Sequence, residues 1–174
     1  MHLSDRIETL AGSRTIALFT EVRRLQAAGE RVINFGVGEP EYGTPAAVID
    51  ATRQALTDGH TRYGEVAGLG ALRERLCREF DGVDTAQVLV GNGSKQLLYS
   101  AFQALCNPGD EVLVPVPYYV SFAAQINLSG ARPVFVPCRN DHQLDVDALT
   151  AAVTERTRAI VINSPNNPTG AVYP

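Results

Sequence analysis

The stretch QVLVGNGSKQLLYSAFQAL, residues 87–105, joins an apolar run, a glycine loop and an amphipathic segment, the pattern of a strand, a turn and a helix. Ser94 stands where a helix N-cap is expected, before apolar residues at helical spacing. The first turn of such a helix has N–H groups without intrahelical partners and the positive end of the dipole. The stretch therefore predicts an anion cradle, most simply for a phosphate; an ordinary turn with a capping serine is the alternative. The apolar residues at helical spacing are Leu97, Leu98, Ala101, Phe102 and Leu105.

Composition restricts the possible partners. The 174 residues are 45% hydrophobic and carry a net charge of −4, enough apolar content for one sizeable α/β core. Negative charge with scattered arginines argues against nucleic acid or an anionic membrane as the main partner. No apolar run is long enough to cross a bilayer, and residues 1–14 lack the apolar centre of a signal peptide. A cytoplasmic location is the default expectation.

The three cysteines give no sign of a metal site. Cys77, Cys106 and Cys138 have no C-x-x-C spacing and no histidine cluster near them. We expect reduced, partly buried thiols.

Short apolar strands and amphipathic helices alternate along the second half of the chain. This alternation predicts an α/β fold with a parallel sheet covered on both faces. Upstream, the sequence predicts a helix over 15–28, a short strand over 32–35 and a helix that Thr44 and Pro45 open and that runs through Leu56. A second helix follows, with inward-facing Leu69, Leu72, Leu76 and Phe80. The downstream strands are expected at 88–90, 112–115, 134–136 and 159–162, and the helices at 94–105, 119–128 and 146–153.

Ligands of open parallel sheets bind beyond the carboxyl ends of the strands. Three segments fall there: 91–95, 117–119 and 163–170. The last has prolines and a glycine around paired asparagines, which favours a rigidly placed amide side chain. An anion cradle, an aromatic face and an oriented amide together suit a flat phosphorylated ring.

From about residue 31 onward, the sequence resembles the N-terminal part of class I aminotransferases, the pyridoxal-phosphate enzymes of fold type I. The bacterial aspartate aminotransferase-like branch is the most similar. Six segments in the family's order carry the resemblance: NFGVGEP (34–40), RYG (62–64), GNGSKQ (91–96), NPGDEV (107–112), PYY (117–119) and NSPNNPTG (163–170).

The resemblance implies part of a three-layer α/β/α large domain with an incomplete sheet. Residues 46–174 would form the partial cofactor-binding domain, and residues 1–45 an N-terminal helix of the small domain and a substrate-side segment. In the family, strands that follow position 174 lie between the strand at 88–90 and the strand at 159–162.

The resemblance also implies roles for single residues. Backbone N–H groups around Gly93, Ser94 and Lys95, with the Ser94 hydroxyl, would hold the phosphate of pyridoxal 5'-phosphate. Tyr119 would stack on the pyridine ring, and Asn167 would donate to the ring's phenolic oxygen.

One further residue would bind the substrate and one the cofactor. Gly38 would lie against the substrate carboxylate, and Tyr63 would reach the partner's cofactor phosphate across a homodimer interface. Each role has a structural alternative. Tyr119 would otherwise be a core aromatic, Asn167 and Gly38 turn residues, and Tyr63 a surface residue.

The sequence departs from the family in one respect that bears on catalysis. Its only lysine is Lys95, in the phosphate loop, where the family's Schiff-base lysine does not lie. That lysine, an aspartate against the pyridine nitrogen and a carboxylate-binding arginine all lie downstream of the segment 163–170 in the family. We therefore expect an N-terminal fragment, truncated or split, with no catalytic residue of its own and no activity by itself.

The expected partners are an amino acid and a 2-oxo acid, with either a second copy in a homodimer or a complementary C-terminal chain. Two other functions stay open. One is a non-catalytic α/β module that binds a phosphorylated ligand or a protein. The other is another fold type I enzyme, such as a β-lyase or a synthase.

Overall fold

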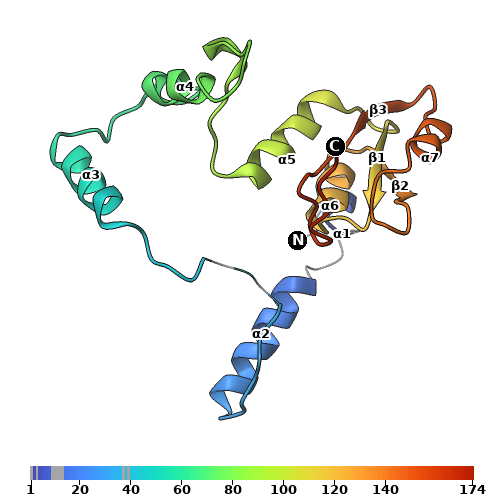
Figure 1. Cartoon of the computed structure of the whole chain (residues 1–174), viewed down its shortest axis with the longest axis horizontal. Coiled ribbons are helices and arrows are strands. Elements are labelled where there is room, and N and C mark those ends of the chain that lie inside the picture. Colours follow the sequence, from blue (N-terminus) through green and yellow to red (C-terminus); the bar gives the residue numbers. More distant parts are fainter. Residues whose placement is uncertain (1, 3, 9–13, 37, 39) are drawn as a thin grey trace. The chain divides into compact units, whose positions relative to one another are not determined.

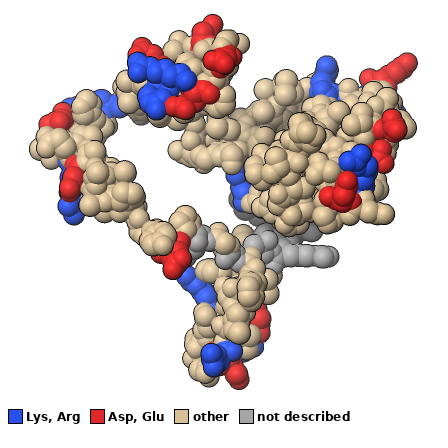
Figure 2. Space-filling model, viewed as in Figure 1, with Lys and Arg blue, Asp and Glu red and all other residues tan. Residues whose placement is uncertain are grey.

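The computed structural model describes residues 2, 4–8, 14–36, 38 and 40–174. The described residues fall into two units, one comprising residues 86–174 with those up to position 8, the other those between positions 14 and 85 (Figure 1). Within these described ranges, no helix has the length and apolar character needed to cross a membrane. Basic and acidic side chains lie beside one another on the face shown in Figure 2.

The larger unit contains a parallel sheet of three strands. They are β1 (Glu111–Val116), β2 (Arg132–Pro137) and β3 (Thr157–Ile160), in the order β2-β1-β3. Both neighbours of β1 run parallel to it, so the predicted parallel arrangement is confirmed for these three strands. β1 is the central strand because it alone has a partner on each edge.

Helices cover both faces of β1. Val112 and Val114, which are fully buried, pack with Phe102 and Ile126 on one face. Leu113, between them in sequence, packs with α7 on the other face, as the alternation of side chains along a strand requires. The covering helices are α5 (Ser94–Leu105) and α6 (Ser121–Leu128) on the first face and α7 (Val146–Ala151) on the second.

The expected strand at residues 88–90 is not formed, and this prediction was wrong for the present chain. These residues follow the short 3-10 helix η1 (Thr85–Gln87) and lie outside the sheet. A β-strand forms only where its backbone hydrogen-bonds to a neighbouring strand. An apolar run in the sequence does not by itself provide that neighbour. In the arrangement that the resemblance implies, other strands stand between residues 88–90 and β3. The short strand expected at residues 32–35 is likewise absent from the described ranges.

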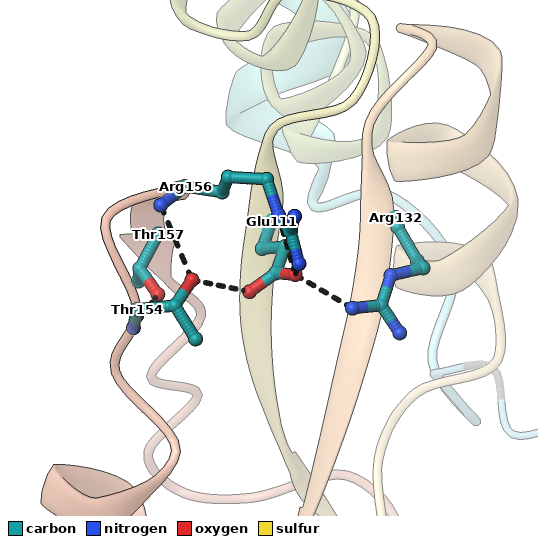
Figure 3. Close-up of polar contacts among 5 residues, drawn as sticks. All are labelled: Glu111, Arg132, Thr154, Arg156 and Thr157. Carbon is teal, nitrogen blue, oxygen red and sulfur yellow. Dashed lines mark hydrogen bonds and ion pairs between the residues drawn. The ribbon is translucent and has the colours of Figure 1, made fainter.

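A buried carboxylate fixes the start of β1. The Glu111 side chain is 2% exposed and lies among donors from β2 and from the turn before β3 (Figure 3). Its Oε1 accepts from Arg132 Nη2 at 2.6 Å and from Arg156 Nε at 3.1 Å, and its Oε2 accepts from Thr154 Oγ1 at 2.7 Å. The Glu111 backbone N–H also donates to the Arg156 carbonyl at 2.9 Å. One side chain thus ties β2, β1 and the turn before β3.

These donors favour the ionised carboxylate. The hydrogen bond from Thr154 is the largest cause, followed by that from Arg132, and together with Arg156 they outweigh burial and lower the pKa of Glu111 from 4.5 to about 2.

The smaller unit contains α2 (Arg14–Ala27), α3 (Ala46–Thr57) and α4 (Gly70–Cys77). The short helix α1 (Asp5–Glu8) belongs to the larger unit. All the helices expected from periodicity in residues 11–85 form, but α3 and α4 bury no residue. Of the residues expected to face inward there, Leu76 is half-buried and Leu72 is 42% exposed, while Leu69 and Phe80, which lie just outside α4, are 68% and 61% exposed. Periodicity gives an apolar helix face but does not supply the surface that covers it.

The core position of Ile126 gives a first prediction. This side chain is fully buried between α5 and β1, so Ile126→Ala should lower the free energy of unfolding by about 2–5 kcal/mol. Leu105→Ala is the control, because Leu105 is 55% exposed, and its cost should stay below about 1 kcal/mol. Urea unfolding followed by circular dichroism measures both, and equal losses would contradict the assigned core.

The Glu111 carboxylate gives a second prediction. Because its pKa is lower in the folded chain than its ordinary 4.5, its stabilising contribution is complete above pH 4.5 and is lost as the pH falls toward 2. Glu111→Gln should lower the urea midpoint at pH 7, and the difference from the wild type should shrink between pH 4.5 and 2. Glu155→Gln removes the same charge at an exposed position and should change the pH 7 midpoint little. A difference that is constant with pH would refute the assignment.

Candidate functional site

A cavity of about 380 Å³ lies where three segments of the larger unit meet. They are the first turn of α5, the stretch around the start of α6, and the segment that follows β3. These segments are the ones expected to meet at the sheet rim. The lining residues are Ser94, Lys95, Leu98, Tyr119, Phe122, Gln125, Asn163 and Asn167.

The N-cap of α5 lies one residue earlier than the sequence suggested. The N-cap is Gly93, at φ 85°, and not Ser94, which is the first helical residue. The backbone turns sharply there because glycine adopts this left-handed conformation without strain. Gln96 Oε1 accepts from the Asn92 N–H at 3.0 Å, which satisfies a donor just before the helix. The Ser94 side chain therefore lies at the cavity and does not cap its own helix.

Tyr119 gives the cavity an aromatic face. Its ring meets Phe122 edge to face, with centroids 5.6 Å apart, and Lys95 Nζ lies 5.5 Å from the Tyr119 centroid. A hydrogen bond involving Ser121 is the main cause that lowers the pKa of Tyr119, and Lys95 adds to it. The positive charge therefore lies against the aromatic side of the cavity.

The segment after β3 is held by Asn166, which is 7% exposed. Its Oδ1 accepts from Thr169 Oγ1 at 2.9 Å, and its backbone pairs with Gly170 and Ala171, each at 2.8 Å. The neighbouring Asn167 donates its N–H to Asn163 Oδ1 at 2.9 Å. Of the two adjacent asparagines, Asn166 thus holds the loop and Asn167 lines the cavity.

Gln125 lines the cavity although it lies outside the segments that the sequence predicted for the site, and Asn163, in one of those segments, had no role assigned to it. Gln125 is 6% exposed in a helix, SFAAQINL, that is otherwise mostly apolar. A polar residue on the buried face of such a helix is a signal that could have identified it.

Two predicted site residues belong to the smaller unit. Gly38 is exposed, and a Cβ built on it would meet nothing within 4 Å. Tyr63 is fully exposed on its loop. The cavity is lined by residues of the larger unit only, so the roles of Gly38 and Tyr63 stay predictions.

The residues around the cavity fit the chemistry of pyridoxal phosphate. A helix N-terminus and an ammonium suit a phosphate, an aromatic ring suits a pyridine ring, and an amide suits a polar ring substituent. Among the described residues, no group of three or more His, Cys, Asp or Glu side chains is placed to hold a metal.

Comparison with known proteins gives consistent results. The family model for aminotransferase class I and II matches residues 30–174. An aspartate aminotransferase of Geobacillus stearothermophilus is 42% identical over 99% of this chain and 46% of its own length. An aspartate/prephenate aminotransferase of Cereibacter sphaeroides is 42% identical over 98% of this chain and 44% of its own length.

Solved aminotransferase structures are similar to this chain, also over about half of their own length. The aspartate aminotransferase of Thermus thermophilus with maleate matches all of this chain with a TM-score of 0.95 and 38% identity, over 47% of its own length. The alanine aminotransferase of Pyrococcus furiosus matches 99% of this chain with a TM-score of 0.91 and 32% identity, over 46% of its own length. The chain thus has the fold of part of these enzymes and spans about half their length. The fold, the family model and the sequence identities agree, and the chain belongs to the class I and II aminotransferases, a family that depends on pyridoxal phosphate.

Proposed function

We propose that this chain provides the phosphate-binding and ring-binding part of an aminotransferase that transfers an amino group between an amino acid and a 2-oxo acid. The observation that carries the proposal is that Ser94, Lys95, Tyr119 and Asn167 line one cavity at the start of α5. Membership of the aminotransferase family supports it. The names of the similar proteins favour aspartate as the amino acid.

The start of α5 is proposed to bind the phosphate. The first N–H groups of a helix have no intrahelical partner, and the helix dipole adds positive potential at the same place. Gly93 has no side chain to obstruct the approach, and the Ser94 hydroxyl is one more donor at the cavity. Lys95 belongs to the same turn, and its ammonium is proposed to add positive charge at the phosphate end.

Tyr119 and Asn167 are proposed to hold the ring. When bound, pyridoxal phosphate supplies the electron sink that assists bond breaking at the α-carbon of an amino acid. The Tyr119 ring offers a flat surface for stacking, and the Asn167 amide is proposed to donate to a polar ring substituent. Because Asn163 and the Asn166 loop hold Asn167 by hydrogen bonds, its backbone is in place before a ligand arrives.

The remaining parts of the proposal concern the whole enzyme. Residues 1–45 would form the substrate side, with Gly38 near the substrate carboxylate. Tyr63 would contact the phosphate in the partner's site of a homodimer located in the cytoplasm. Proton transfer at the substrate α-carbon needs a base, which the family resemblance implies is a lysine amine, and the only lysine of this chain, Lys95, is assigned to the phosphate end. We therefore propose that the 174-residue chain binds the cofactor but does not transaminate by itself.

Cofactor binding by the chain tests the ring assignment. Tyr119→Leu should weaken binding of pyridoxal phosphate about tenfold, because the stacking surface is lost. Tyr119→Phe keeps the ring and should change the affinity less than about threefold. Equilibrium dialysis measures both, with the unfolding midpoint of each variant as the check on folding. Equal affinities of the two variants would remove Tyr119 from the ring site.

Activity tests the assignment of Lys95. The purified chain, given pyridoxal phosphate, aspartate and 2-oxoglutarate, should form no oxaloacetate in a coupled assay. Co-expression of the chain with the C-terminal half of the Geobacillus stearothermophilus relative should restore measurable turnover. Turnover by the chain alone would refute the assignment of Lys95 to the phosphate end.

A further inference from the structure

Gln125 joins α6 to the first turn of α5. Its Nε2 donates to the carbonyl oxygen of Lys95 at 2.6 Å, although the two residues are 30 positions apart in sequence. The bond is shielded, because Gln125 is only 6% exposed. It fixes the first turn of α5 relative to α6, the helix that begins just after Tyr119.

The carbonyl oxygen of the same side-chain amide accepts no hydrogen bond. Gln125 Oε1 is buried without a hydrogen-bond partner, and it is the only such side-chain atom among the described residues. The orientation of the amide follows from its other bond, because only the NH₂ group can donate to the Lys95 carbonyl. An apolar side chain of similar size would avoid the cost of a buried, unpaired acceptor. The arrangement therefore points to a donor that arrives when a ligand binds.

Lys95 is the cationic residue that lies beside Gln125 at this site. Lys95 and Gln125 both line the site cavity, and both also line a second cavity of about 390 Å³ beside it. The Lys95 ammonium lies 5.5 Å from the centroid of the Tyr119 ring, a cation–π contact. A flat ligand stacked on this face of Tyr119 would take the place of the ammonium.

We propose that Gln125 is a positioning residue that holds Lys95 at two points when a phosphorylated ring is bound. Its Nε2 keeps the bond to the Lys95 carbonyl, and its Oε1 accepts a hydrogen bond from the Lys95 ammonium that the ring displaces from Tyr119. The positive charge then stays beside the first turn of α5, where the phosphate binds. This inference rests on the proposed function, since the displacing ring is that of pyridoxal phosphate.

A double-mutant cycle tests the proposal. Pyridoxal phosphate binding is measured by equilibrium dialysis for the wild-type chain, Gln125→Met, Lys95→Met and the double variant. Gln125→Met should weaken binding about fivefold to tenfold when Lys95 is present. In the Lys95→Met background the same change should matter less than about twofold, because the donor is gone. Gln103→Met, at an exposed position on α5, is the matched control and should leave the affinity unchanged.

A second measurement keeps Gln125 in place. In the nitrogen-15 NMR spectrum, the side-chain NH₂ signal of Gln125 should move when pyridoxal phosphate is added to the wild-type chain. In the Lys95→Met variant, which still binds weakly, it should stay near its ligand-free position. Equal losses of affinity in both backgrounds, or a signal that moves alike in both proteins, would reduce Gln125 to a structural role and overturn the inference. If the wild-type chain does not bind pyridoxal phosphate, the proposed function and this inference both fall.

Discussion

The buried carboxylate of Glu111 is the interaction on which the larger unit depends. It lies at the start of the central strand and accepts hydrogen bonds from β2 and from the turn before β3. The starts of three strands that are distant in sequence are thereby aligned, and their carboxyl ends then lie at one edge of the sheet. Two of the segments that line the cavity, the stretch before α6 and the loop after β3, follow those ends. The hydrogen bonds of Glu111 that align the strands thus also help to place the two segments at the cavity.

Local patterns predicted the helices well. The bounds of α5 agree with those expected from apolar spacing, and α2 and α7 begin within one residue of expectation. The strands that pair with β1 were also found. Residues 88–90 were assigned wrongly to a strand because pairing is a property of two segments, and a short apolar run carries no information about its partner. The exposed apolar faces of α3 and α4 have the same explanation, since burial depends on what covers a face.

The sequence predicted which residues line the site where the type of side chain and its position after a strand were sufficient. Ser94, Lys95, Tyr119 and Asn167 line one cavity, and Tyr119 and Asn167 follow the carboxyl ends of β1 and β3, as the rule for parallel sheets predicts. Their roles as cofactor ligands stay predictions, as do those of Gly93, Gly38 and Tyr63 and the division at residue 45. The position of the N-cap depended on the backbone angle of Gly93, which a sequence pattern does not give. The hydrogen bond between Gln125 and the Lys95 carbonyl joins residues whose proximity exists only in the folded chain.

The solitary lysine has a practical consequence for work on this protein. A lysine-specific protease can cut the 174-residue chain only after Lys95, within the first turn of α5. A protease needs several residues in extended conformation around the bond it cleaves, so cleavage requires this turn to unwind. The rate at which a single cut appears on a gel therefore depends on how readily the first turn of α5 opens, and it is read without any label or substitution in the molecule.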